Sequence, residues 1–275
     1  MLKKFISFFF GSVFVVGLGF VLYPTFSNWF NQFHASRVVA SYQEHVEEIQ
    51  DFSEYKNAAY EHNAQIYAVG SLTHSVYMEK QDDLNTYNSL LNIGDDGVMG
   101  IIRIPKIDVK LPVYHSTEES VLQCAVGHYI GSSLPVGGEN THCILSGHRG
   151  LPSARLFTDL DQLEEEDMFY LEVFDEILAY KVDLVQTVLP DEVDDLNPEA
   201  GCDYVTLVTC TPYGVNTHRL LVRGSRVPYV PEEEEAVVLV EDDGFKMIWL
   251  VPIVLLLIVI FLILWRRKSR NVGGL

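Results

Sequence analysis

Residues 204–227 read YVTLVTCTPYGVNTHRLLVRGSRV. Two short runs of β-branched and other apolar residues, Tyr204–Cys210 and Arg219–Val227, flank a turn that begins Thr-Pro-Tyr-Gly. This pattern predicts two strands, because β-branched residues favour strands and Pro and Gly interrupt them. Strands joined by such a turn lie side by side. The segment therefore predicts that Arg219, which opens the second strand, faces Cys210, which ends the first.

Further runs of the same kind lie between residues 97 and 230. They are separated by Gly, Pro, Asn and Asp, and comprise Ile101–Ile104, Val109–Tyr114, His142–Leu145, Phe169–Phe174 and Ala179–Val188. Many short strands with turn residues between them predict a mainly β body, either a barrel or a sandwich. A longer acidic connection, Val188–Asp203, precedes the first quoted run, and loops of this length are often functional.

The composition excludes several classes of protein. The chain has 275 residues, 19 of them Lys or Arg and 38 Asp or Glu, and a net charge of −19. This balance argues against nucleic-acid binding, which needs clustered basic residues. The hydrophobic content of 48% argues against a disordered chain. All the acidic residues lie between residues 24 and 245, so we expect this part to stand off an anionic membrane.

Both ends of the chain have the composition of membrane spans. Phe5–Tyr23 and Met247–Trp265 are uncharged apolar runs, and each would form a helix of roughly 28 Å, close to the thickness of a hydrocarbon core. Basic residues lie just outside both runs, so the positive-inside rule predicts cytoplasmic termini and an extracellular middle at the cell membrane. A cleaved signal peptide is the alternative for the first run.

The resulting domain order has six parts. We expect a transmembrane helix (1–23), an extracellular helical segment (24–96), a β body (97–230), an acidic linker (231–246), a second transmembrane helix (247–265) and a basic cytoplasmic tail (266–275). Within the second part, residues 31 to about 62 place apolar side chains on one face of an amphipathic helix. A second short helix is expected from Asp82 to Leu91.

Cys210 is the candidate nucleophile. A cysteine at a strand end before a turn is held by the sheet yet exposed at its edge, and its thiol needs a base or a cationic neighbour to become a thiolate. His148, which follows another β run between two glycines, is the candidate base. Arg219 could stabilise an oxyanion. The alternatives are a turn histidine at His148 and a surface ion pair at Arg219.

The other three cysteines are Cys124, Cys143 and Cys202. An even total of four permits disulfides, but the apolar surroundings of Cys143 favour a small buried hydrophobe, and we expect the same of Cys124. Cys202 stays open. His142 and Cys143 are adjacent and point to opposite faces of a strand, and no Cys-x-x-Cys motif is present. We therefore predict neither a metal site nor a cofactor.

Several segments resemble those of a known family. Thr206–Cys210 is similar to the TLxTC signature of sortases, the extracellular cysteine transpeptidases of Gram-positive bacteria. Ser146–Arg149 resembles their histidine segment, and Arg219 falls where their catalytic arginine would. The resemblance covers about residues 85 to 227. Residues 97–107, 111–115 and 211–222 resemble class C, pilus-assembling sortases, of which a membrane helix after the barrel is also typical.

This resemblance implies an eight-stranded sortase β-barrel with N-terminal amphipathic helices and a transmembrane helix at each end. It implies that Cys210 cleaves an LPxTG-like sorting signal between Thr and Gly, forms a thioester, and passes the acyl group to a lysine amine of a pilin. His148 would protonate the leaving amine, Arg219 would hold the oxyanion, and Thr209 would contact the substrate. The implied partners are pilin or surface-protein substrates and the lipid bilayer.

One feature of class C sortases has no counterpart here. Many carry an N-terminal lid with an Asp-Pro-aromatic motif, but no Asp-Pro pair occurs between residues 31 and 97. Val69–Met78 is either a different lid, with Tyr77 over the thiol, or an ordinary connector. Two other functions stay open: a housekeeping sortase that anchors surface proteins to peptidoglycan, and a catalytically inactive receptor or scaffold on the same barrel.

Overall fold

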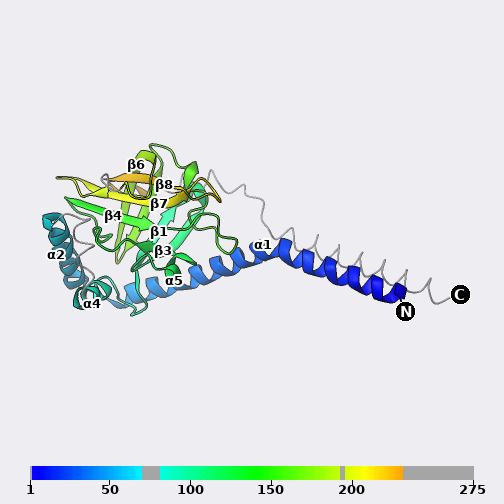
Figure 1. Ribbon diagram of the computed structural model, residues 1–275. Coiled ribbons are helices and arrows are strands. Elements are labelled where there is room, and N and C mark those ends of the chain that lie inside the picture. The colour runs from blue at the N-terminus through cyan, green and yellow to red at the C-terminus, as the bar shows by residue number, and fades with distance from the viewer. Residues whose placement is uncertain (1, 70–80, 193–195, 232–275) are drawn as a thin grey trace. The chain divides into compact units, whose positions relative to one another are not determined.

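The computed structural model describes residues 2–69, 81–192 and 196–231. The chain divides into two units, residues 1–234 and 235–275, and the second unit lies wholly outside the described residues. The same holds for the acidic linker beyond Pro231, the second predicted transmembrane helix, the basic tail and the candidate lid residue Tyr77. The first unit consists of N-terminal helices and one β-barrel (Figure 1).

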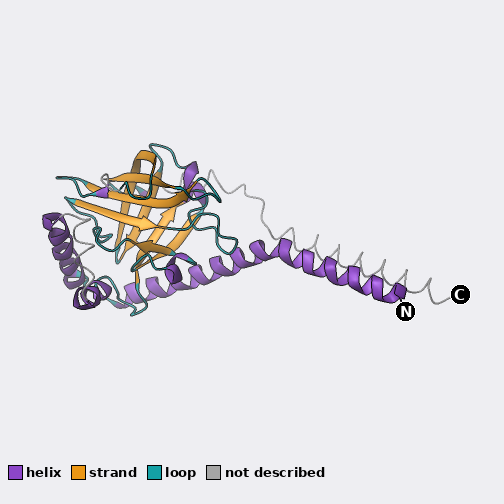
Figure 2. Ribbon diagram, in the orientation of Figure 1, coloured by secondary structure: helices purple, strands orange, loops and turns teal. Residues whose placement is uncertain are grey.

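Eight strands close into the barrel (Figure 2). In chain order they are β1 (Val98–Ile104), β2 (Val109–Tyr114), β3 (Val126–His128), β4 (Thr141–Ser146), β5 (Met168–Val173), β6 (Glu176–Val188), β7 (Asp203–Thr211) and β8 (His218–Val227). Their order around the barrel is β1-β2-β3-β4-β7-β8-β6-β5. The structure thus confirms the mainly β body and selects the barrel over the sandwich.

β3 is the one strand of the barrel that the apolar and β-branched runs in the sequence do not predict. It has three residues, which is too short to show alternation, and its central residue is Gly127. A side chain there would collide with the Ser116 carbonyl oxygen. β3 pairs in parallel with β2 and antiparallel with β4, so it closes the gap between them.

The prediction of a single helix over residues 31 to about 62 is wrong. The structure has two helices, α1 (Leu2–Glu48) and α2 (Ser53–Val69). Between them Phe52 turns onto the barrel and stacks on Phe174, with ring centroids 4.8 Å apart. The Asp51 carboxylate accepts a hydrogen bond from the Ser53 backbone N–H at 2.9 Å, and this contact stabilises the start of the new helix.

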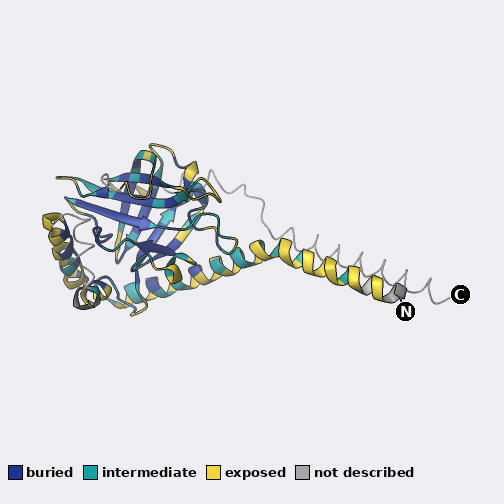
Figure 3. Ribbon diagram, in the orientation of Figure 1, coloured by how far each residue is buried: buried dark blue, intermediate teal, exposed yellow. Residues whose placement is uncertain are grey.

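The first helix, α1, joins the apolar N-terminal run to the barrel without a break. It is long and apolar enough to cross a membrane, and its side chains from Phe9 to Tyr23 are mostly exposed (Figure 3). Farther along, Val39 and Tyr42 pack against β1. The buried Tyr42 hydroxyl donates to the Met99 carbonyl at 3.3 Å and accepts from the Phe174 N–H at 2.9 Å. One phenol therefore ties α1 to two parts of the barrel.

Two asparagines of α1 hold the loop that follows β4. Asn31 Nδ2 donates to the Ser153 carbonyl at 3.0 Å, and Asn28 Oδ1 accepts from the Arg155 N–H at 2.9 Å. We call this pair of contacts the asparagine clamp. At the other end of the helical segment, Tyr87 of α4 (Gln81–Ser89) bonds His128 Nδ1 at 2.8 Å.

Candidate active site

Three chain segments meet at one end of β7. Cys210 and Arg219 are direct partners across the antiparallel β7–β8 pair. β4 runs parallel to β7 on its other side, with Ser146 opposite Val208, and the pairing continues one residue further because the Gly147 N–H donates to the Val208 carbonyl at 3.1 Å. The loop that starts at His148 therefore lies beside the end of β7 that carries Cys210.

These side chains line one pocket of about 330 Å³. Cys210, His148 and Arg219 all contribute to its wall, and none of them is fully buried. The structure thus brings together the three residues predicted from distant parts of the sequence. The rest of the wall is mostly apolar, and includes Tyr129, Ile144, Val188, Leu189, Pro190, Leu196 and Leu221. Several of these come from the long connection after β6, which places it against the site as expected of a functional loop.

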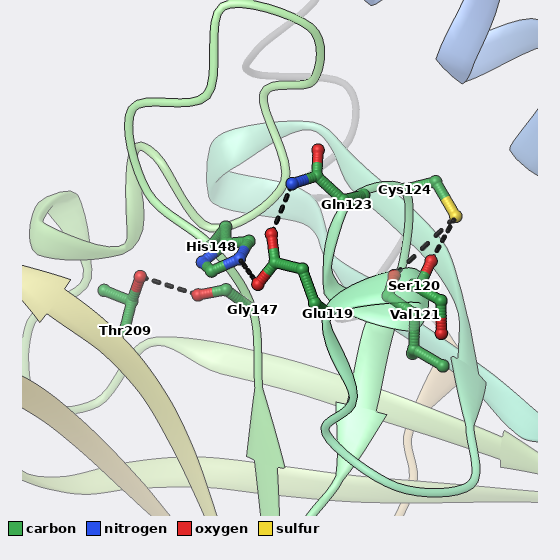
Figure 4. A network of polar contacts seen from close by, with 8 residues as sticks. All are labelled: Glu119, Ser120, Val121, Gln123, Cys124, Gly147, His148 and Thr209. Carbon is green, nitrogen blue, oxygen red and sulfur yellow. Dashed lines mark hydrogen bonds and ion pairs between the residues drawn. The ribbon is translucent and has the colours of Figure 1, made fainter.

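The His148 ring has one side-chain partner among the residues that the structure describes. Its Nε2 lies 3.4 Å from Glu119 Oε2. Glu119 is the first residue of the short helix α5 (Glu119–Leu122), and its other carboxylate oxygen accepts a hydrogen bond from Gln123 Nε2. Figure 4 shows this chain of contacts, with Glu119 between the two donors. Hydrogen bonds from Gln123 and His148 lower the pKa of the Glu119 carboxyl.

Sequence reasoning did not find Glu119. It follows another glutamate, Glu118, and no local pattern distinguishes the two. Its approach to His148 depends on the parallel crossover from β2 to β3, which carries α5 to the mouth of the pocket.

Arg219 has no carboxylate partner within 4 Å in the described part of the chain. Its Nη1 donates instead to the backbone carbonyls of His218 at 3.1 Å and Asn216 at 3.4 Å. The neighbouring Arg149 is differently placed, because its Nη2 pairs with Asp161 at 2.5 Å and its guanidinium lies over the Tyr213 ring. Of these two arginines, Arg219 is therefore the one whose charge is available to a ligand in the pocket.

The Thr209 hydroxyl has an internal partner. It donates to the Gly147 carbonyl at 2.8 Å, and the residue is 2% exposed. Figure 4 shows this bond beside His148. Thr209 lines the pocket, but its hydroxyl holds the His148 loop against β7.

The four cysteines are all unpaired, with no disulfide. Cys143 is buried in the core, and burial raises the pKa of its thiol. Cys124 is half-buried, which also raises its pKa. His142, considered above for a metal site, is buried with Nε2 2.7 Å from Thr206 Oγ1 and Nδ1 3.1 Å from the Asn197 carbonyl oxygen. It therefore does not share a site with His148.

Comparisons with known proteins point to one family. A family model described as the sortase domain matches residues 102–227. Sortase D of Bacillus subtilis is 30% identical over 131 residues, which cover 46% of this chain and 63% of that protein. Sortase A of Bacillus anthracis is 32% identical over 131 residues, which cover 47% of this chain and 60% of that protein. The chain thus spans about three fifths of the length of these curated relatives.

Solved structures match over more of the chain. Sortase C1 of Streptococcus agalactiae is 50% identical with a TM-score of 0.67, and the match covers 70% of this chain and 100% of that one. A sortase C of Streptococcus pneumoniae, whose crystal structure was described as informing catalysis and pilin substrate specificity, is 38% identical with a TM-score of 0.60. That match covers 70% of this chain and 97% of the other.

Proposed function

The chain belongs to the sortase family of cysteine transpeptidases, and we propose that it cleaves an LPxTG-like sorting signal between Thr and Gly and transfers the acyl group to a lysine amine of a pilin. The observation that carries this proposal is the pocket in which Cys210 lies across from Arg219 and next to the His148 loop. The class C sortases among the structural neighbours favour pilin polymerisation.

In the proposed first step the Cys210 thiolate attacks the threonine carbonyl carbon. The carbon–nitrogen bond to glycine breaks, the leaving amine takes a proton from the His148 imidazolium, and a thioester remains on Cys210. In the second step a lysine amine attacks the thioester carbonyl. An isopeptide bond forms, the imidazole accepts the amine proton, and the thiolate leaves.

Arg219 is proposed to stabilise the oxyanion of both tetrahedral intermediates. Its guanidinium is anchored by backbone carbonyls beside Cys210, so it needs little reorganisation during the reaction. Loss of one such donor typically costs roughly a hundred- to thousandfold in rate. Thr209 is proposed to act at the substrate pocket through the loop it holds, with its backbone next to the acyl group.

The membrane setting is part of the proposal. We propose that Phe5–Tyr23 crosses the bilayer and that the barrel lies outside the cell, with cytoplasmic termini. The exposed apolar surface of this part of α1 and the preceding Lys3 and Lys4 support this arrangement.

The test uses the full-length chain in detergent and a fluorogenic LPxTG-type peptide. Wild-type protein should cleave the peptide, and Cys210→Ala should abolish cleavage. Cys202→Ala is the matched control, because it removes a partly exposed thiol outside the pocket and should leave cleavage intact. Cleavage by Cys210→Ala protein would refute the assignment of the nucleophile.

A second experiment separates pilus assembly from wall anchoring. Candidate pilins co-expressed with the enzyme should give a covalent ladder on a denaturing gel, and a lysine-free acceptor pilin should not. A single wall-linked species without a ladder would instead favour the housekeeping function.

A further inference from the structure

We propose that Glu119 is a positioning residue that orients the His148 imidazole toward the strand that carries Cys210. This inference rests on the proposed function of the pocket. Its basis is the contact of 3.4 Å between Glu119 Oε2 and His148 Nε2, in a site where the imidazole must carry a proton to the leaving amine.

The carboxylate is itself held in place. Gln123, four residues along the chain, donates its side-chain N–H to Glu119 Oε1, which leaves Oε2 for the imidazole. In Figure 4 one ring nitrogen of His148 faces Glu119, and the other lies on the side of Thr209 and β7. With the Glu119 carboxylate at one ring nitrogen, the other ring nitrogen is directed toward the strand that carries Cys210. This is the arrangement by which a third group orients a base next to a nucleophile.

The charges around the ring favour this role. Cys210 on β7, Arg219 on β8 and Glu192 on the connection after β6 line the same pocket as His148, and Glu119 on α5 contacts its ring. Arg149, next in the loop, is paired with Asp161. Among these groups, Glu119 is the carboxylate in direct contact with the ring, so it is the one that can fix the orientation of the imidazole.

The expected effect is modest because Glu119 is mostly exposed, with a side-chain exposure of 69%. Exposed ion pairs correspond to about a two- to fivefold change in an equilibrium. Removing this contact should therefore lower the population of correctly oriented His148 by about two- to fivefold. High salt should shrink the difference, since exposed charges are screened.

The experiment compares Glu119→Gln with Glu118→Gln in the full-length chain. Glu118→Gln is the matched control, because it removes the same charge one residue away, and the described hydrogen bond and ion pair of the His148 ring go to Glu119 instead. Iodoacetamide alkylation of Cys210 is followed by peptide mass spectrometry from pH 5 to 10. At pH 7 Glu119→Gln should react about two- to fivefold more slowly than the control, and at pH 10, where the thiol ionises without an imidazolium, the rates should converge.

Peptide kinetics give a second measurement. Glu119→Gln should lower the maximum of the pH profile of kcat/KM by the same factor, mainly through kcat, and Glu119→Asp should restore part of it. Equal rates for Glu119→Gln and Glu118→Gln at pH 7 would overturn the inference, as would an equal loss at pH 7 and pH 10. Iodoacetamide reacts with Cys210 without a sorting signal, so alkylation tests the role of Glu119 independently of peptide cleavage. Failure of the wild-type protein to cleave the peptide would refute the proposed function and not the role of Glu119.

Discussion

Replacing Thr209 by valine tests whether the His148 loop is held by a single buried hydroxyl. Valine has the shape of threonine but cannot donate, so the substitution removes the bond of 2.8 Å to the Gly147 carbonyl and little else. Thr209 is 2% exposed, so water cannot readily replace the lost donor. The change therefore leaves a carbonyl group without this partner at the base of the loop.

The size of the effect follows from this geometry. Leaving a buried acceptor unsatisfied costs about 1–3 kcal/mol. For a barrel of this size that corresponds to a fall in the midpoint of thermal unfolding of roughly 2–4 °C per kcal/mol. The activity should fall further, because a displacement of about 1 Å at a catalytic group can cost on the order of a hundredfold in rate.

The assay combines thermal unfolding by circular dichroism with peptide kinetics. Thr209→Ser is the control, since it keeps the hydroxyl and loses one methyl group, worth about 0.8 kcal/mol. Thr209→Val should lose kcat with little change in KM, and Thr209→Ser should retain most of kcat. If Thr209→Val protein keeps the wild-type midpoint and kcat but raises KM, the hydroxyl serves the substrate and not the loop.

Three further predictions concern stability, each measured as the midpoint of thermal unfolding. Tyr42→Phe should cost about 1–3 kcal/mol, because two buried backbone groups lose their partner; a wild-type midpoint would contradict this. Gly127→Ala should cost about 1–3 kcal/mol or more, because its methyl group would meet the Ser116 carbonyl, and normal stability would show that β3 can shift. Acidification should also destabilise the barrel. Burial lowers the pKa of His128 to about 3 and that of His142 to about 4, below an unfolded value of about 6.5. The unfolded chain therefore binds more protons below about pH 6.5, and stability present at neutral pH is lost as the pH falls toward 4; a midpoint that does not fall between pH 7 and 4.5 would refute this.

Local patterns predicted most of the strands. β2 has the predicted bounds, and the strand pair β7–β8 forms as expected because its two runs are joined by a short turn. The position of Arg219 opposite Cys210 follows from that pairing alone. The family resemblance supplied the count of eight, which the residue pattern could not give because β3 has only three residues.

Features that depend on long-range packing were not predictable. The break between α1 and α2 contains neither Pro nor Gly, and it exists because Phe52 leaves the helix to stack on Phe174. Glu119 reaches His148 through a crossover between parallel strands, and its own sequence neighbourhood gives no sign of this. The internal bond of Thr209 likewise requires the β4–β7 pairing, between segments that lie far apart in the chain.

The asparagine clamp fixes the position of the barrel along α1. Asn28 and Asn31 hold the loop that follows His148, and they lie five to eight residues beyond Tyr23, about 8–12 Å along the helix axis. If Phe5–Tyr23 lies in the bilayer, as we propose, α1 holds the pocket at a fixed height above the membrane surface. Under that arrangement a substrate must present its cleavage sequence at this height above the bilayer, so reach becomes a criterion of selection.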